Sequence, residues 1–488
     1  MSQFHFSWLQ LTILLPLIGA LRIARQKDPE TAQRQSVVFL AGTLITSVLA
    51  WLDFSLQTAS EIADPWDWVG ARLGGHLLVM DELSAPLIPL SALAFLLTTV
   101  VTLRTKVARF SFTGTLIAES ILLATLSCKN PWMIVGLLAL SILPPLWELR
   151  VRGKPIAVFA LHMGVSLVAM AGGWYLVSSH GPEGNESLFG VALLTIGVLI
   201  RSGVVPVHCW ITDLFEHATF GTALLFVTPM AGAYAAVRLL LPVAPDWALR
   251  SIAIMSLITA VYAAAMALVQ HEARRFFCYL FLSHASLVLV GLETATPIAL
   301  TGALSVWLAV GLGLTGFGLA LRCLEARVGR ITLDDFHGLY EVTPSLANLF
   351  LLTGLASVGF PGTFGFVGTE LLIDGAVQAY PMIGLAVIVA AALNGIAIMQ
   401  AYFRLFGGAR HIVSLGMHSR AVERLAVMTL ATLIFAGGLY PQPGIVSRYH
   451  AAISIIGARG GKATTEPHAD QLHAAAADNH HRSPANKD

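Results

Sequence analysis

The chain has 488 residues, of which 56% are hydrophobic and only 12% are charged, and its mean hydropathy is +0.74. A soluble domain usually carries about 25% charged residues, so this composition excludes an ordinary soluble globular protein. The formal net charge of +1 gives no reason to expect a nucleic-acid partner.

Apolar runs of membrane-spanning length fill nearly the whole chain as far as Leu439. A helix that crosses a hydrocarbon core needs about 20 mostly apolar residues, and we count about fourteen such runs between short polar breaks. Because only helices or closed barrels satisfy the backbone in lipid, runs of this length predict helices. The expected fold class is an all-α polytopic membrane protein with about 14 transmembrane helices in the lipid bilayer.

Basic residues fall in alternate loops, which indicates the orientation, because short cytoplasmic loops are enriched in Lys and Arg. The loops between them are acidic or neutral. With an even number of spans, both termini are predicted on the outer side of the membrane. The basic loops contain Arg22, Arg25, Lys27 and Arg34; Arg104, Lys106 and Arg109; Arg150, Arg152 and Lys154; Arg274 and Arg275; Arg322, Arg327 and Arg330; and Arg404, Arg410, Arg420 and Arg424.

Two segments are predicted to be discontinuous helices, near 201–213 and 359–370. Each combines glycine or polar residues with a proline inside apolar sequence, which interrupts a helix. Such breaks are tolerated only where they are buried in protein or line a wet cavity, and they mark ion sites in many transporters. A tight helix-packing bend is the alternative interpretation of the second segment. The residues assigned to breaks or gating are Pro206, Gly359, Pro361, Gly362, Gly365 and Glu370.

We expect one transmembrane domain over residues 1–445. Residues 446–488 are expected to form a short terminal segment and a disordered tail that is rich in Ala, Gly and polar residues. The tail histidines could bind a metal, but without fixed spacing an inert solvated tail is the favoured interpretation. These histidines are His468, His473, His480 and His481.

Charged residues inside the apolar runs are the candidate functional groups, because a charge at the bilayer centre costs about 2.5 to 3.5 kcal/mol. Arg201 follows an apolar run and precedes the first break, and a snorkelling arginine at a helix end is the alternative. Glu119 lies near the middle of the run 110–128, where it has to be protonated or paired across helices with a residue such as Arg201. A carboxyl group that exchanges a proton suits a relay; a neutral acid that only forms hydrogen bonds is the alternative.

A later span carries further candidates. Arg274 and Arg275 open it, and one-turn spacings align Arg275, Tyr279 and Ser283 on one helix face that is polar enough to carry water. His284 could serve as a relay or as a hydrogen-bonded packing residue. His208 lies in the first break.

Other charges are expected at the membrane interfaces. Asp81 and Ser84 fit the cap of a helix at its outer end. Glu148 is expected at the cytoplasmic end, where a charge costs little.

Several segments together resemble the antiporter-like membrane subunits, chains L, M and N, of bacterial NADH:quinone oxidoreductase and their relatives in Mrp antiporters. The resemblance covers about residues 75 to 410, and it implies proton translocation in a bacterial inner membrane along charged residues at mid-membrane. Arg201 falls on the lysine of the family's broken seventh helix, and Arg274 or Arg275 on a later basic residue. The motifs that carry the resemblance are Asp81 to Ser84, Arg201 to Asp213, Glu272 to Tyr279, His337 to Leu339 with Pro344, and Gly359 to Glu370.

The chain also departs from the family pattern. The fifth-helix glutamate should fall near Ala139 or Leu140, and neither is acidic. The histidine expected within 226–232 is missing, and a later lysine is replaced around Thr315. An arginine cannot give up its proton as a lysine can, so Arg201 could orient water but would not itself carry protons.

The sequence therefore favours a proton-translocating membrane subunit of a larger complex. No dinucleotide, haem, cluster or metal-ligand spacing is visible, so we expect no cofactor or metal in this chain and no redox activity by the chain alone. The expected partners are other membrane subunits, with a soluble catalytic subunit as an optional addition. The energising subunit of a DAB-type inorganic carbon uptake system is one alternative. A non-conducting scaffold, which the missing family residues support, is another.

Overall fold

The computed structural model describes residues 7–57, 61–63, 76–180, 185–292, 296–379, 381–408 and 419–460. Within these ranges the chain is almost wholly helical, as predicted for an all-α membrane protein. The tail histidines and Arg410 lie outside the described residues.

The N-terminal part contains one small sheet among helices. Strands β1 and β2 pair in antiparallel register, with Glu61 opposite Asp81. The elements are α1 (Trp8–Ile23), α2 (Pro29–Leu56), β1 (Glu61–Ala63), β2 (Val79–Asp81), α4 (Ser84–Val101), η1 (Arg104–Arg109), α5 (Phe112–Leu126), α6 (Pro131–Ser141), α7 (Leu143–Val151), α8 (Ala157–His180) and α9 (Asn185–Ser202).

The C-terminal part is built from helices and short helical turns, of which η2 is a single π-helical turn. The elements are α10 (Cys209–His217), α11 (Phe220–Val227), α12 (Ala231–Ala235), η2 (Ala236–Leu240), α13 (Asp246–Leu268), α14 (Ala273–Val290), α15 (Pro297–Val328), η3 (Leu339–Glu341), α16 (Pro344–Ser357), α17 (Phe364–Ala379), α18 (Pro381–Phe406), α19 (Ala421–Leu439) and α20 (Gln442–Gly460).

Ten helices in the described ranges are long and apolar enough to cross a membrane. Four shorter apolar helices accompany them: α1, α5, α16 and most of α9. The polytopic prediction is therefore confirmed, while the count of about fourteen spans stays a prediction.

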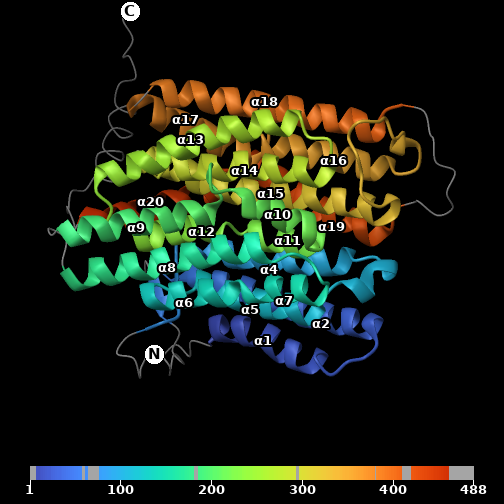
Figure 1. The fold of residues 1–488 in the computed structure, drawn as a ribbon, viewed down its shortest axis with the longest axis horizontal. Coiled ribbons are helices and arrows are strands. Elements are labelled where there is room, and N and C mark those ends of the chain that lie inside the picture. The colour runs from blue at the N-terminus through green and yellow to red at the C-terminus, as the bar shows by residue number, and fades with distance from the viewer. Residues whose placement is uncertain are drawn as a thin grey trace, which may run out of the picture.

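The helices lie side by side along the long direction of the molecule (Figure 1). α1 and α2 form one edge of this array, and α17 and α18 form the opposite edge. The 32-residue α15 runs through the interior and packs against α4, α14, α16, α17, α19 and α20. It is the element around which the C-terminal half is assembled.

Local sequence sets several helix starts. Asp28 accepts a hydrogen bond from the Thr31 backbone N–H (2.9 Å) at the start of α2, and Asn130 caps α6 through the Met133 N–H (3.2 Å). In both helices a proline follows the cap, where its missing N–H costs nothing.

Both predicted helix breaks are present. α9 ends at Ser202, and the chain turns through Gly203, whose φ of 73° suits a residue without a Cβ, before α10 begins. The second break separates α16 from α17 and contains Gly359 (φ 86°) and Gly362 (φ 87°). Discontinuous helices at 201–213 and 359–370 are therefore confirmed.

Two further interruptions were not predicted from the sequence. α6 gives way to α7 at Ile142, just before Pro144 and Pro145. α11 and α12 are separated at Thr228 to Met230, where Met230 has a left-handed φ of 52°. The apolar composition of both segments conceals the break, because hydropathy averages across it.

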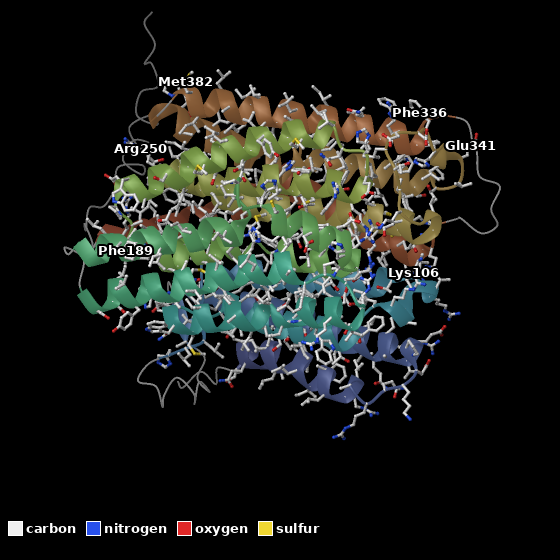
Figure 2. All side chains as sticks on the ribbon, in the orientation of Figure 1. Lys106, Phe189, Arg250, Phe336, Glu341 and Met382 are labelled. Atoms are coloured by element: carbon white, nitrogen blue, oxygen red, sulfur yellow. The ribbon has the colours of Figure 1, made fainter. Side chains whose placement is uncertain are left out.

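The basic loops meet at one end of the bundle, as the alternation predicts. Arg322, in α15, donates to the carbonyl of Thr98 (2.6 Å), and Arg420, just before α19, donates to that of Val101 (3.0 Å). Segments far apart in sequence are thus tied to the end of α4. Lys106 and Glu341 lie at this end, and Arg250 lies at the other (Figure 2). We call the end that contains Lys106 the basic end.

The domain boundary expected at residue 445 needs correction. It falls inside α20, a 19-residue helix that packs on α15 and is part of the same bundle. The sequence obscured this helix because it contains charged and glycine residues and has low overall hydropathy.

Close packing of α17 on α15 yields the first prediction. A Cβ added at Gly302 would lie 2.3 Å from the backbone nitrogen of Leu372, whereas one added at Gly395 would meet nothing within 4 Å. Gly302→Ala should therefore destabilise the protein by about 1 to 3 kcal/mol through overpacking. Gly395→Ala, its matched control, should be neutral or slightly stabilising. Thermal unfolding in detergent measures both, and equal melting temperatures for the two variants would contradict the packing argument.

Candidate functional site

Arg201 is buried where helices are interrupted. It lies in the last turn of α9, is 5% exposed, and is flanked by the breaks between α6 and α7 and between α11 and α12. Its Nη2 donates to the Ser141 hydroxyl (3.2 Å), and its Nη1 contacts the Met163 sulfur (3.4 Å). The guanidinium also lies over the Phe226 ring, 4.4 Å from the centroid. The prediction of an interior position is confirmed, and the snorkelling alternative is wrong.

Neighbouring residues stabilise the break beside Arg201. The indole of Trp210 donates to the carbonyl of Ile200 (2.8 Å), which also accepts from the backbone N–H of Gly203 (3.0 Å). The backbone N–H of Val205 donates to the Thr259 hydroxyl (3.0 Å). Pro206 itself is exposed on the outside of the bundle. The break is thus satisfied by side chains, and its proline does not line the interior.

A first cavity extends from Arg201 to Glu148. It offers about 50 Å³ to the centres of water-sized molecules, and one water needs about 10 to 15 Å³ by this measure. Ser141, Thr115 and Thr222 also line it, so its wall carries hydroxyl groups as well as apolar side chains. The cavity is large enough for several waters and polar enough to hold them.

Glu148 is the functional candidate that sequence reasoning missed. We expected it at an interface, but it is 6% exposed, on α7, about two helical turns beyond Ser141. Its carboxylate accepts from the Thr219 backbone N–H (2.7 Å), the Thr222 hydroxyl and Arg152 (3.3 Å). Because Glu148 is close in sequence to the basic loop, we expected an exposed side chain. Its spacing of about two helical turns from Ser141 was the one signal in the sequence that it lies on the same side as the interior residues.

A second cavity also borders Arg201. It offers about 30 Å³ to water-sized molecules and is lined by Arg201, Ser202 and Phe226 together with α14 residues such as Ala285 and Leu289. Arg201 and Phe226 line both cavities. The guanidinium and the ring beneath it therefore form the wall between two internal spaces.

Glu119 does not pair with Arg201. It is fully buried on α5, and neither carboxyl oxygen has a hydrogen-bond partner among the described residues. An isolated carboxylate in such surroundings is very costly, so the neutral acid is the form that fits. The sequence left two possibilities for Glu119, a protonated acid or an ion pair across helices. The structure contains no such ion pair.

Residues of α14 lead from the surface toward the interior. Arg275 is 54% exposed, Tyr279 is half-buried, and Ser283 is buried and accepts from the Asn394 amide (2.8 Å). The His208 ring lies 6.0 Å from that of Tyr279, so the first break and this helix face are neighbours. The predicted alignment on one face of α14 is confirmed.

His284 and Arg274 have separate surroundings. The His284 Nδ1 bonds the carbonyl of Leu280 (2.7 Å), and its Nε2 has no partner among the described residues. Arg274 pairs with Glu325 through Nε (2.7 Å) and donates to the Ala218 carbonyl (3.1 Å). Arg274 therefore joins α14, α15 and the end of α10, whereas His284 keeps one free nitrogen in the interior.

The second break begins next to His284, because the backbone of Ser357, the last residue of α16, lies against that histidine. Pro361, Gly362 and Glu370 are exposed, and only Gly365 of the assigned residues is buried, against the Ala356 carbonyl and Ala309. These residues therefore occupy the outer side of the bundle near α17. A gating role for them stays a prediction.

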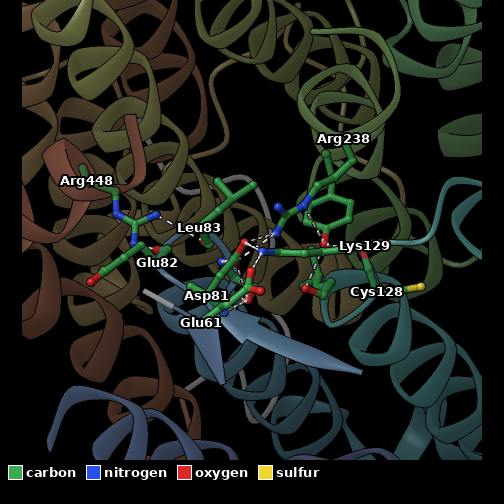
Figure 3. A network of polar contacts seen from close by, with 11 residues as sticks. Glu61, Asp81, Glu82, Leu83, Cys128, Lys129, Arg238 and Arg448 are labelled. Atoms are coloured by element: carbon green, nitrogen blue, oxygen red, sulfur yellow. Dashed lines mark hydrogen bonds and ion pairs between the residues drawn. The ribbon is translucent and has the colours of Figure 1, made fainter. Parts of the chain in front are cut away.

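A polar network closes the end opposite the basic end (Figure 3). Asp81 accepts from the Ser84 N–H (3.1 Å), as expected of a cap, and it also pairs with Arg238 (2.7 Å) and Lys129 (3.3 Å). Lys129 also pairs with Glu61. Burial disfavours the charged carboxylate of Asp81, but the two cations outweigh that effect and lower its pKa to about 2.

Together, the fold and the site define a polytopic α-helical membrane protein whose interrupted helices place an arginine between two internal cavities. The chain matches the family described as NADH:quinone oxidoreductase/Mrp antiporter, TM, over residues 152–394. It belongs to this family of antiporter-like membrane proteins. The resemblance seen in the sequence is thereby confirmed.

Similar proteins cover most of the chain. The chloroplastic NAD(P)H-quinone oxidoreductase chain 4 of Mesostigma viride is 25% identical over 76% of this chain and 78% of its own length. A chain of respiratory complex I from Thermus thermophilus has a TM-score of 0.80 at 20% identity and covers 92% of this chain and 99% of its own. A chain of the Mrp complex from Dietzia sp. DQ12-45-1b has a TM-score of 0.78 at 17% identity, with 92% and 98% covered. Both solved structures share the fold.

The Asp81 carboxylate should make stability depend on pH. Its pKa in the folded protein, about 2, lies below the ordinary 3.8, so the stability it contributes is full above about pH 4 and is lost as the pH falls toward 2. The contribution is on the order of 2 kcal/mol. The melting temperature of the native protein should exceed that of Asp81→Asn near pH 6, and the gap should narrow between pH 4 and 2.

Glu61→Gln is the matched control for this experiment. Glu61 is 58% exposed and contacts the same Lys129, so its removal should change the melting temperature little. A gap between native protein and Asp81→Asn that stays constant down to pH 2 would show that the Asp81 pKa is not depressed.

Proposed function

We propose that this protein is a proton-translocating, antiporter-like membrane subunit of a larger complex. One observation carries the proposal: a buried guanidinium divides the interior into two cavities, and the first of them reaches a buried carboxylate. Its membership of a family described as an antiporter supports this function.

The path begins at the basic end. Ser111 and Gly114, at the start of α5, line the first cavity near that end, and Glu148 and Arg201 lie further along it. Water in this cavity would connect the Glu148 carboxylate to the space beside Arg201. Glu148 can accept and release a proton, whereas Arg201 keeps its proton and orients water through its N–H groups.

Arg201 and Phe226 act as the barrier between the cavities. Passage of a proton then requires water on both sides of the guanidinium, and a movement of either side chain would join the two spaces. The neutral surroundings of His284, with one free ring nitrogen, suit a later acceptor. Conduction is thus assigned to Glu148, the water beside Arg201 and His284.

The wider setting follows from the same proposal. In this proposal the chain lies in a bacterial inner membrane with its basic end in the cytoplasm and both termini outside, an orientation that the distribution of basic residues supports. Other membrane subunits are its partners, with a soluble catalytic subunit supplying the driving reaction, and protons are the transported ion.

Proton flux in proteoliposomes that contain the complex tests the proposal. Glu148→Gln removes the acceptor and Arg201→Gln removes the charge between the cavities, so each should reduce flux by about 10-fold or more. The exposed residues Glu341 and Arg109 supply matched controls, and Glu341→Gln and Arg109→Gln should retain native flux.

Melting temperatures establish that each variant is folded before its flux is compared. Native flux in folded Glu148→Gln would remove this carboxylate from the path. Absence of flux from the native complex would instead favour the non-conducting scaffold.

Glu119→Gln distinguishes the two buried carboxyl groups. Because Glu119 has no polar contact among the described residues and does not line the first cavity, its neutral amide analogue should leave flux within about twofold of native. The same proteoliposome assay measures it. Loss of flux equal to that of Glu148→Gln would place Glu119 on the path.

A further inference from the structure

Arg201 carries a charge that the protein does not balance. An arginine stays protonated in proteins, and an isolated cation in a low-dielectric interior is costly. In the described part of the chain no Asp or Glu forms an ion pair with it. Its contacts are a hydroxyl, a thioether and an aromatic face, none of which bears a full negative charge.

Three other arginines with buried or half-buried side chains have acidic partners. Arg238 pairs with Asp81, Arg274 with Glu325, and Arg327 with Glu423. Arg322 and Arg448 are also buried and form no ion pair among the described residues, but each donates to backbone carbonyls. Arg201 differs from all of these arginines, because neither a carbonyl nor a carboxylate among the described residues accepts from it.

The guanidinium has N–H groups without a hydrogen-bond acceptor among the described residues, and Arg201 lines a cavity. Of its five N–H groups, one is given to an oxygen, that of Ser141, while Nη1 faces a weak sulfur acceptor and Nε has no partner among the described residues. The first cavity beside it holds about 50 Å³ for the centres of water-sized molecules. A small acceptor could enter and bond the free N–H groups.

The carboxylate of the same cavity does not fill this role. Glu148 lies about 10 Å along the helix from Ser141, and its oxygens are occupied by Thr219, Thr222 and Arg152. Its negative charge is therefore neutralised locally, and the region next to the guanidinium keeps its positive potential.

We propose that the first cavity binds a small monovalent anion against the guanidinium of Arg201. A halide or a compact oxyanion such as formate fits both the single charge and the cavity, whereas a multiply charged or larger anion does not. The inference rests on the same site as the proposed function, but it concerns equilibrium binding and does not require proton flux. The anion would supply the negative charge that the family resemblance places near Ala139 or Leu140, where this chain has no acidic residue.

Bromide is the probe for the site, because its anomalous scattering locates it. Crystals of the protein in its complex, grown in gluconate and soaked in bromide, should show an anomalous peak beside the guanidinium of Arg201. Formate added in excess should remove the peak if the site also takes oxyanions, and a peak that resists formate would restrict the site to halides. Absence of any peak there in the native protein would overturn the proposal.

Substitution of Ser141 gives the sharpest variant pair. Ser141→Asp replaces the hydroxyl that now contacts Nη2 with a carboxylate. This carboxylate should pair with Arg201 and abolish bromide binding while the protein stays folded. Ser141→Asn has nearly the same shape without the charge and should retain the peak. A peak that persists in Ser141→Asp, or in Arg201→Gln, would show that the anion is not held by this guanidinium.

Thermal unfolding provides a second measurement that needs no crystal. An anion that binds only the folded protein stabilises it, so the native protein and Ser141→Asn should melt at a temperature about 2 °C or more higher in bromide than in gluconate of equal ionic strength. Ser141→Asp should show no such difference. Equal melting temperatures of the native protein in the two salts would contradict a site occupied at the concentrations tested. The measurement uses no pH gradient, so a failure of proton translocation leaves its result unaffected.

Discussion

The backbone of a membrane protein has to satisfy its hydrogen bonds within the protein. The polar interior of this protein lies where helices are interrupted and their backbone hydrogen bonding is incomplete. Helices α6, α9 and α11 all end near Arg201, within the bundle. Each ending exposes carbonyls or N–H groups that lipid could not accept but that protein side chains and water can. Trp210 bonds one of these carbonyls directly, that of Ile200. Interrupted helices thus create the polar space, and the arginine occupies it.

The two ends of the bundle use their charges differently. At the basic end, arginines bond backbone carbonyls at the ends of α4 and α10, so loops distant in sequence are held together. At the opposite end, Asp81 is shared between Arg238 and Lys129. Both ends are therefore fixed by polar contacts of arginine and lysine side chains, and the cavity beside Arg201 lies between them.

Much of the fold could be predicted from the sequence, because hydropathy and loop charge respond to the bilayer itself. Membrane-spanning runs, the shared end of the basic loops and the breaks at Gly203 and Gly359 all followed from local composition. The breaks at Ile142 and Met230 did not, because apolar side chains on both sides hide a change in backbone direction. Prolines are present at both of these breaks, Pro144 and Pro145 after Ile142 and Pro229 before Met230, so a proline in an apolar run without a neighbouring glycine was not a sufficient signal.

The site was predictable in part. Arg201 could be identified because a charged residue stands out in an apolar run. Its contacts could not be identified, because they depend on which helices lie next to α9. Glu148 seemed to belong to a basic loop, and only the bond to the Thr219 N–H, 71 residues away in sequence, shows that it faces inward. Glu119 was conspicuous for the same reason as Arg201, yet its surroundings are apolar. Sequence thus locates buried charges better than it identifies their contacts.

The contact between α20 and the start of α4 bears on how the chain is made. Arg448 is buried and donates to the carbonyls of Glu82 and Leu83, more than 360 residues earlier in the sequence. During synthesis those carbonyls are inserted long before their donor leaves the ribosome. The start of α4 therefore lacks these hydrogen bonds until α20 has been made and inserted.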